Sequence, residues 1–143
     1  MSAHPPVFDA TVLVKLFLPE TGSDRVQALM EEVLAQHPDG PAVPDLIHAE
    51  CGNLFWKKVQ RGDLTPEIAQ ACMTDLRALP MRVFPMTDLA ENALDWALRY
   101  RITVYDAVYA VLAGALDTPL YTADTALILM LDKAPVQIRG IQG

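Results

Sequence analysis

Short apolar stretches alternate along this chain with longer segments in which apolar residues recur every three or four positions. The short stretches have the length of β-strands, and the longer ones have the period of helices that bury one face. This alternation is typical of a parallel β-sheet covered by helices on both faces. We therefore expect an α/β fold with strands over residues 6–9, 41–44, 81–85, 119–122 and 136–139.

Local signals place helices between these strands. Ser23 suits an N-cap, as does Thr65, which Pro66 follows at the first helical position. Gly62 suits the position just after a helix end. In the segment 87–100 the spacing predicts a buried stripe made of Leu89, Ala93, Leu94, Ala97 and Leu98. The predicted helices cover residues 10–18, 22–37, 44–62, 64–79, 87–100, 105–116 and 124–134.

The composition, 52% hydrophobic and 20% charged over 143 residues, is that of a compact globular protein, so we expect a single domain over residues 1–143. Cys51 and Cys72 form no CxxC pair, which gives no support to a structural zinc site and suits buried thiols in a reducing compartment. The sequence shows neither a secretory signal pattern nor an apolar stretch long enough to cross a membrane. We expect a soluble cytoplasmic protein.

The net charge is −7, from 11 lysines and arginines against 18 aspartates and glutamates. Such a charge repels nucleic acid at long range, because non-specific affinity comes mainly from neutralising phosphates. A nucleic-acid substrate would therefore need help from cations.

Four acidic residues fall where a parallel sheet binds its ligands, beyond the carboxyl ends of the strands. Asp9 ends the first predicted strand, Glu50 lies early in the helix after the second, Asp106 opens the apolar helix, and Asp124 follows the strand at 119–122. Crowded carboxylates repel one another and need a counter-charge. Mg²⁺ or Mn²⁺ would supply it, and either can activate water for attack on a phosphate.

Each acid also has a purely structural interpretation. Asp106 and Asp124 could cap their helices, and Asp9 could form an Asx turn. Glu50 has no such capping role, and its structural alternative is a place on a solvated helix face.

Asn53 and Lys57 follow Glu50 at positions i+3 and i+7, so the three share one helix face. That face is either solvent-exposed surface or a wall of the site. Lys57, Lys58 and Arg61 form the densest basic cluster, which is either a solvated helix end or a patch that guides phosphates. No Ser-His-Asp set, GxGxxG motif or P-loop can be assembled.

Four segments resemble the PIN-domain ribonucleases, in particular the VapC-type toxins of bacterial toxin–antitoxin pairs. "VFDATVLVKLFLPE" is similar to the opening Asp-x-Ser/Thr motif of that family, and "HAECGNLFWK" to its Glu-containing helix. "TVYDAVYAVLA" resembles the Tyr-Asp-Ala helix, and "LYTADTAL" the Thr-x-Asp-x-x-Leu segment. Ala123 and Thr125 stand where the family often has a basic residue.

The resemblance implies a three-layer α/β/α sandwich around a five-stranded parallel sheet, commonly dimeric. It implies a Mg²⁺- or Mn²⁺-dependent endoribonuclease that binds metal through Asp9, Glu50, Asp106 and Asp124, with Thr11 and Asn53 in supporting positions. It also implies a cognate VapB-like antitoxin that blocks the acidic pocket.

Two other interpretations stay open. One is a phosphatase-like or phospho-acceptor α/β domain with Asp9 as nucleophile, although Thr11 stands where the haloacid-type DxD pattern has its second aspartate. The other is a PIN-fold domain that binds its partner without turnover. A test for a phosphoprotein separates the first from a nuclease, and an RNA cleavage assay separates the second.

Overall fold

The computed structural model describes residues 3–141, so the first two and last two residues of the predicted domain lie outside the described part. Its strands form a five-stranded, wholly parallel sheet in the order β3-β2-β1-β4-β5. The strands are β1 (Val7–Phe8), β2 (Ala42–Pro44), β3 (Arg82–Phe84), β4 (Leu120–Thr122) and β5 (Ile138–Gly140). Each lies within, or overlaps, a predicted strand. The predicted α/β class is confirmed.

Strand β1 lies at the centre of the sheet because both of its residues are apolar and can be buried on both faces. Val7 and Phe8 are fully buried. Val7 is in register with Ala42 of β2 and with Leu120 of β4. The Phe8 ring meets the Tyr121 ring edge to face, with centroids 5.6 Å apart. The short β1 is thus fixed by neighbours on both sides.

The helices agree with the predicted segments, with boundaries that shift by a few residues. Thr65 caps α4 by accepting a hydrogen bond from the Ile68 backbone N–H, and Gly62 adopts a positive φ of 82° just after α3, both as predicted. The helices are α1 (Ala10–Leu13), α2 (Ser23–Gln36), α3 (Ile47–Gln60), α4 (Pro66–Ala78), α5 (Ala90–Tyr100), α6 (Val104–Leu116) and α7 (Thr125–Met130).

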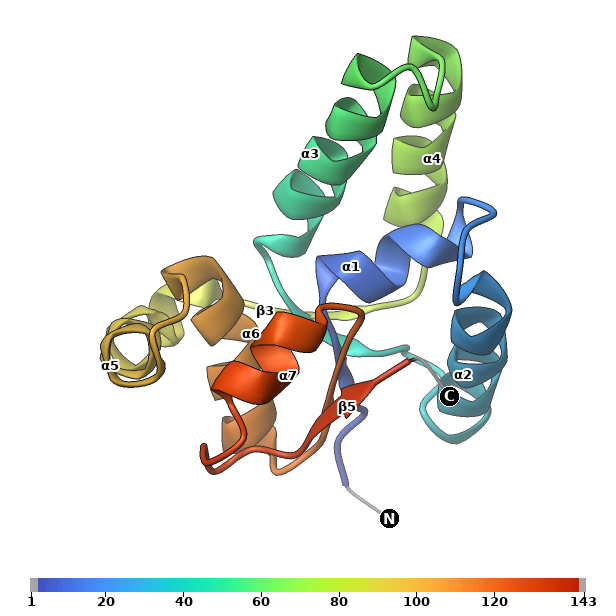
Figure 1. Ribbon diagram of the computed structural model, residues 1–143. Coiled ribbons are helices and arrows are strands. Elements are labelled where there is room, and N and C mark those ends of the chain that lie inside the picture. Colours follow the sequence, from blue (N-terminus) through green and yellow to red (C-terminus); the bar gives the residue numbers. More distant parts are fainter. Residues whose placement is uncertain (1–2, 142–143) are drawn as a thin grey trace.

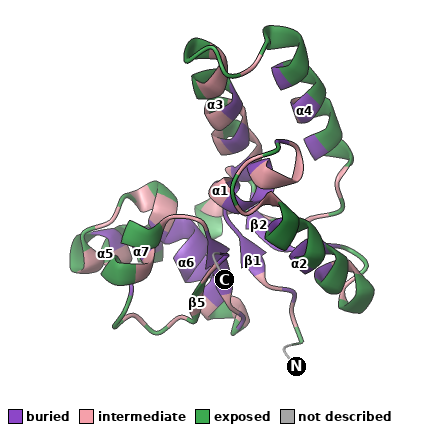
Figure 2. Ribbon diagram, turned by 45° about the vertical axis from the view of Figure 1, so that its right-hand side comes forward, coloured by how far each residue is buried: buried purple, intermediate pink, exposed green. Residues whose placement is uncertain are grey.

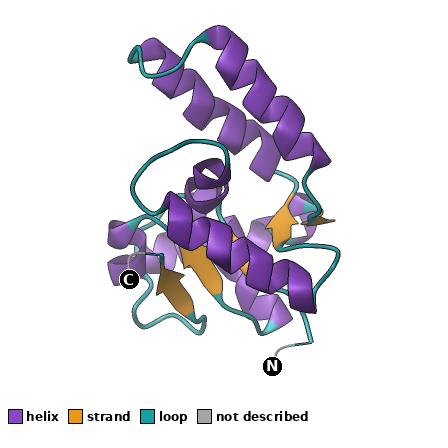
Figure 3. Cartoon of the chain, turned by 90° about the vertical axis from the view of Figure 1, so that its right-hand side faces the viewer, coloured by secondary structure: helices purple, strands orange, loops and turns teal. Residues whose placement is uncertain are grey.

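Helices cover both faces of the sheet, as predicted. Figure 3 shows α2 in front of the strands and further helices behind them. Helix α6 packs against β1, β2 and β4, and it is buried nearly all round, from Ala107 to Ala113. Figure 2 shows this buried helix beside the more exposed α5. Helices α3 and α4 pack on each other and project away from the sheet (Figure 1).

Two local predictions about helices are wrong. The predicted helix at 10–18 is only one α-helical turn, and it continues as a short 3₁₀-helix over Val14–Leu16. Ser23 is not the N-cap of α2, because Gly22 holds that position at a φ of 91°. The Ser23 hydroxyl instead accepts from the Glu20 backbone N–H and donates to the Leu18 carbonyl, so it stabilises the turn before the helix.

The predicted buried stripe on α5 is too wide. Leu89, just before the helix, and Ala93 and Ala97 within it are buried, whereas Leu94 and Leu98 are 52% and 74% exposed. Helix α5 packs mainly on α6, so only one narrow face of it is covered. Across residues 3–141, no helix is both long and apolar enough to cross a bilayer.

The direction in which successive strands are added to the sheet reverses at β1. The chain adds β2 and β3 on one side of β1 and then crosses to place β4 on the other side. Such a switch point leaves room beyond the carboxyl ends of the two strands, where α/β proteins bind ligands. Asp9 directly follows β1 at this point.

Candidate functional site

Asp9 is almost fully buried, at 5% exposure, where β1 turns into α1. Its Oδ1 accepts hydrogen bonds from the Thr11 hydroxyl at 2.5 Å and from the Val12 backbone N–H at 3.2 Å. The carboxylate therefore caps α1 through the N–H three residues on, and not through the N–H two residues on as in the Asx turn that is its structural alternative. The capping role does not exclude a second role, because a carboxylate has lone pairs beyond those used here.

Burial raises the pKa of Asp9 to about 6, and the nearby Asp106 charge adds to the increase. The hydroxyls of Thr11 and Thr122 and the Val12 N–H oppose the increase, because each favours the charged form. Desolvation is the larger effect. The protein thus holds at this position a carboxylate that gains considerably from a nearby positive charge.

The Thr11 hydroxyl joins the ends of β1 and β4. It donates to Asp9 and accepts from the Ala123 backbone N–H at 2.9 Å. This fits the predicted supporting role of Thr11, since one side chain fixes the carboxylate and also connects two strand ends.

We expect Thr11→Val to lower the free energy of unfolding by about 1–3 kcal/mol, because it removes one partner of two partly buried hydrogen bonds. Thr11→Ser keeps the hydroxyl and is the matched control, with a smaller loss. Urea denaturation at pH 7 measures both. Equal stability of the valine and serine variants would show that the hydroxyl contributes little.

Glu50 and Asp106 approach the same region from two helices. Glu50 lies in the first turn of α3, and Asp106 in the first turn of α6. Thr103, not Asp106, caps α6: the Asp106 backbone N–H donates to the Thr103 hydroxyl at 3.1 Å. The capping alternative for Asp106 is therefore wrong, and its side chain is available for another role.

The two carboxyl groups share the electrostatic environment of Asp9. The pKa of Glu50 is raised by burial and by the Asp106 charge, while the neighbouring Tyr109 hydroxyl lowers it. The pKa of Asp106 is raised by burial and by the Asp124 charge. Mutual repulsion and burial act together here, so a positive charge placed among these carboxylates would favour their ionised forms.

A cavity of about 560 Å³ opens at this point. It is lined by five of the predicted site residues, which are Asp9, Thr11, Glu50, Asn53 and Asp106. The remaining lining residues are Ala10, Leu46, Ala49, Leu54, Lys57, Tyr105 and Tyr109. The tertiary structure thus gathers three of the four predicted acids, and both predicted supporting residues, around one space.

Asp124 does not line this cavity. Its Oδ1 accepts from the backbone N–H groups of Ala126 and Leu127, at 3.0 and 3.2 Å, so it caps α7. The capping interpretation of Asp124 is correct, yet its charge still acts on Asp106. The fourth acid is an electrostatic neighbour of the other three.

The donor set suits a hydrated divalent cation. Within residues 3–141, no three carboxyl, histidine or cysteine side chains form a ready-made metal cage. Mg²⁺, however, is commonly held by one or two carboxylates and keeps several water molecules. Glu50 Oε1 is buried and has no hydrogen-bond partner. Such an acceptor, beside two further carboxyl groups in one cavity, fits a cation or one of its waters.

The three predicted basic residues separate in space. Lys57 lines the cavity, as the wall interpretation of its helix face expects. Lys58 instead forms an ion pair with Glu20 at 2.8 Å, and Lys15 contacts the same carboxylate at 3.0 Å. Arg61 follows the end of α3 and does not line the cavity. Only Lys57 is placed to meet a ligand there.

Two tyrosines of the site were missed in the sequence. Tyr105 and Tyr109 line the cavity, on either side of Asp106 in α6. In the sequence they look like ordinary members of an apolar helix. The spacing in the sequence could have indicated Tyr109, because it lies three residues after Asp106 and therefore on the same helix face. The nearby Cys51 thiol has its pKa raised by burial to about 12, so it is an inert core group.

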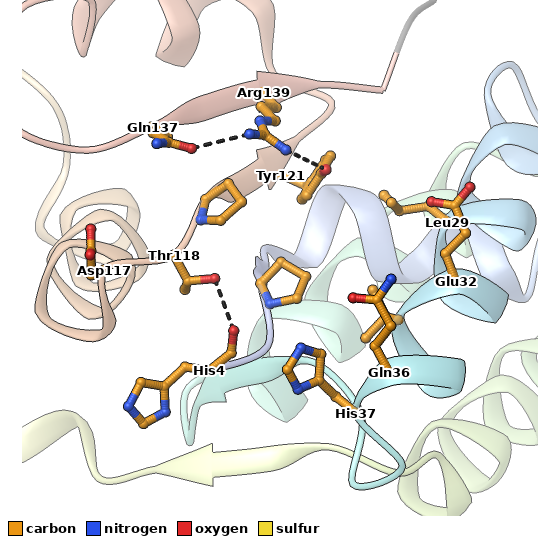
Figure 4. Close-up of a pocket in the computed structure, with 13 residues that line it drawn as sticks. His4, Leu29, Glu32, Gln36, His37, Asp117, Thr118, Tyr121, Gln137 and Arg139 are labelled. Carbon is orange, nitrogen blue, oxygen red and sulfur yellow. Dashed lines mark hydrogen bonds between the residues drawn. The ribbon is translucent and has the colours of Figure 1, made fainter. Parts of the chain in front are cut away.

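A second cavity, also of about 560 Å³, lies at the amino ends of β1, β4 and β5 (Figure 4). Arg139 donates there to the Tyr121 hydroxyl and to Gln137 Oε1, both at 3.1 Å. The Thr118 hydroxyl donates to the His4 carbonyl at 3.3 Å. None of the predicted site residues lines this cavity, so the acidic cavity is the candidate site.

This chain is similar to proteins named as ribonucleases. Ribonuclease VapC3 of Pyrobaculum aerophilum is 28% identical over 123 residues, which cover 85% of this chain and 90% of that protein. Ribonuclease VapC1 of Mycobacterium tuberculosis is 38% identical over 85 residues, 59% of this chain and 62% of that protein.

Solved structures show the same fold. The crystal structure of PAE2754 from Pyrobaculum aerophilum has a TM-score of 0.69 at 22% identity and covers 95% of this chain and 84% of that one. That of VapBC2 from Rickettsia felis, bound to a promoter DNA fragment, has a TM-score of 0.65 at 15% identity, over 94% of this chain and 96% of that one. The PIN domain family model matches residues 7–130. This chain therefore belongs to the PIN domain family.

Proposed function

We propose that this protein is an endoribonuclease that depends on Mg²⁺ or Mn²⁺ and acts as the toxin of a toxin–antitoxin pair. The observation that carries the proposal is the gathering of Asp9, Glu50 and Asp106 around one cavity at the switch point of a PIN-domain sheet. The ribonuclease names of the relatives support the reaction class.

The chain's own residues have distinct tasks in this proposal. Asp9, Glu50 and Asp106 would hold the cation, with Asp124 adding negative charge close to Asp106. Thr11 donates a hydrogen bond to the Asp9 carboxylate and would hold it in one orientation. When bound, the cation would activate water for attack on a phosphodiester and offset the charge that develops on the phosphate.

The cavity also explains how an acidic protein could accept RNA. Lys57 is exposed at the cavity wall, and no ion pair within residues 3–141 uses its charge. A bound cation and Lys57 together would present positive charge to a phosphate, against a background of −7. Phosphate contacts of this kind position a substrate without reading its sequence.

The test of this function is cleavage of a labelled total-RNA pool by the purified protein. We expect cutting with Mg²⁺ or Mn²⁺ and none with EDTA. Cutting that continues unchanged in EDTA would contradict the metal dependence, and an absence of cutting under all conditions would favour a binding-only domain.

The basic residues give a more specific prediction. In EDTA, Lys57→Ala should weaken RNA binding several-fold and reduce the salt dependence of log K by about 0.7, the value for one phosphate contact on a single strand. Lys58→Ala removes the same charge from a residue already paired with Glu20 and should change RNA binding less. Fluorescence anisotropy at several salt concentrations compares the two. Equal effects would show that the cavity wall does not contact RNA.

We further propose a VapB-like antitoxin as protein partner, a homodimer and a cytoplasmic location. Several solved structures with this fold are toxin–antitoxin or FitAB-type complexes. An acidic cavity would accept a cationic side chain from such a partner, most simply an arginine that pairs with the carboxylates. Co-purification of a small protein from the native host tests the partner, and light scattering tests the dimer.

A further inference from the structure

Tyr109 has a buried hydroxyl that its packing does not explain. The side chain is 2% exposed, and its hydroxyl oxygen has no hydrogen-bond partner. Every other buried side chain of α6 is alanine, valine or leucine. Phenylalanine would fill the same space without a buried polar group that lacks a hydrogen bond, and such a group is destabilising. The hydroxyl therefore calls for a functional explanation.

The matching acceptor lies in the same cavity. Glu50 Oε1 is also buried without a hydrogen bond, and both residues line the acidic cavity. The two groups are close enough to influence each other: the hydroxyl favours the charged carboxylate, and the carboxylate raises the pKa of the Tyr109 phenol. Asp9 acts on the phenol in the same direction, so the hydroxyl keeps its proton and stays a donor.

We propose that Tyr109 is a positioning residue that donates its hydroxyl proton to Glu50 and holds this carboxylate toward the space it shares with Asp9 and Asp106. The proposal rests on the metal-dependent function above, and it assigns a task to a residue outside the acidic set. Groups that orient metal-binding carboxylates by a hydrogen bond contribute strongly to metal affinity, and their loss typically costs about 10–100-fold.

Two measurements on the full chain test this role. Mn²⁺ affinity, measured by calorimetry, should fall about 10-fold or more in Tyr109→Phe. The thermal unfolding temperature in EDTA should change little, since the variant keeps the buried ring and loses one hydrogen bond. Tyr100→Phe is the matched control, because this tyrosine lies on α5 outside the cavity and should leave Mn²⁺ affinity unchanged.

A double-mutant cycle separates positioning from a general effect on the fold. In a Glu50→Gln background, Tyr109→Phe should cause no further loss of Mn²⁺ affinity, because the group on which it acts has already been changed. A further 10-fold loss there would overturn the proposal, as would wild-type affinity in the single variant. If the wild-type protein binds no Mn²⁺, the metal-dependent function fails first and the role of Tyr109 fails with it.

Discussion

The Asp9→Asn protein should cleave RNA at least about 100-fold more slowly than the wild type, since a catalytic metal contributes several kcal/mol to the transition state and each 1.4 kcal/mol is tenfold in rate. Asparagine keeps the size of the side chain and an oxygen that can still accept from Thr11 and Val12. What it removes is one of the negative charges in the cavity. We therefore expect the variant to lose cleavage activity and to keep its fold.

The same substitution should stabilise the metal-free protein. The pKa of Asp9 is raised by burial from 3.8 to about 6, so the unfolded chain releases this proton at a lower pH than the folded protein does. Below pH 4 Asp9 is protonated in both the folded and the unfolded protein, so it does not change the free energy of unfolding. As the pH rises toward 6, the unfolded chain ionises first and the free energy of unfolding falls. A shift of about two units corresponds to roughly 3 kcal/mol above pH 6, as an upper limit.

Two readouts of the same variant test both expectations. RNA cleavage with Mn²⁺ gives the rate, and urea unfolding in EDTA at pH 4 and pH 7.5 gives the stability. The advantage of Asp9→Asn over wild type should grow between these two pH values. Asp63→Asn, at an exposed position, is the control and should match the wild type in both assays. Undiminished cleavage by the Asp9→Asn protein would refute the metal mechanism.

Divalent metal should bind far more weakly at pH 5 than at pH 7.5. A carboxyl group with a pKa of about 6 is mostly protonated at pH 5, and proton competition at Asp9 alone reduces affinity about 10-fold. The pKa values of Glu50 and Asp106 are also raised, so their protonation adds to the loss. Metal should correspondingly raise the unfolding temperature at pH 7.5 and have little effect at pH 5.

Calorimetric titration with Mn²⁺ across this pH range measures the effect directly. Ca²⁺, which prefers more oxygen ligands and longer bonds, gives a comparison of ion type at the same charge. The Asp9→Asn variant should show a flatter pH dependence, because one competing proton site is gone. Affinity that is constant from pH 5 to pH 7.5 would mean that the raised carboxyl groups do not bind the metal.

The sequence was sufficient for features that depend on neighbours along the chain. Thr65 and Gly62 mark helix ends because a cap or a positive φ is set within one turn. The acids were predictable for a similar reason. Parallel strands bring their carboxyl ends to one edge of the sheet, so residues that follow strands, such as Asp9, fall near that edge.

Other features depended on which surfaces meet in three dimensions. Helical spacing placed Leu94 and Leu98 in a buried stripe, but α5 packs mainly on α6 and leaves them exposed. Adjacent lysines look equivalent in the sequence, yet Lys57 faces the cavity and Lys58 meets Glu20, 38 residues earlier in the chain. The spacing of Tyr109 from Asp106 was visible, but its unsatisfied hydroxyl beside Glu50 was not. Local patterns determine the elements and their ends, because those energies are local. Only the packing of segments that are distant in the sequence decides which side chains are buried and which charged side chains come into contact.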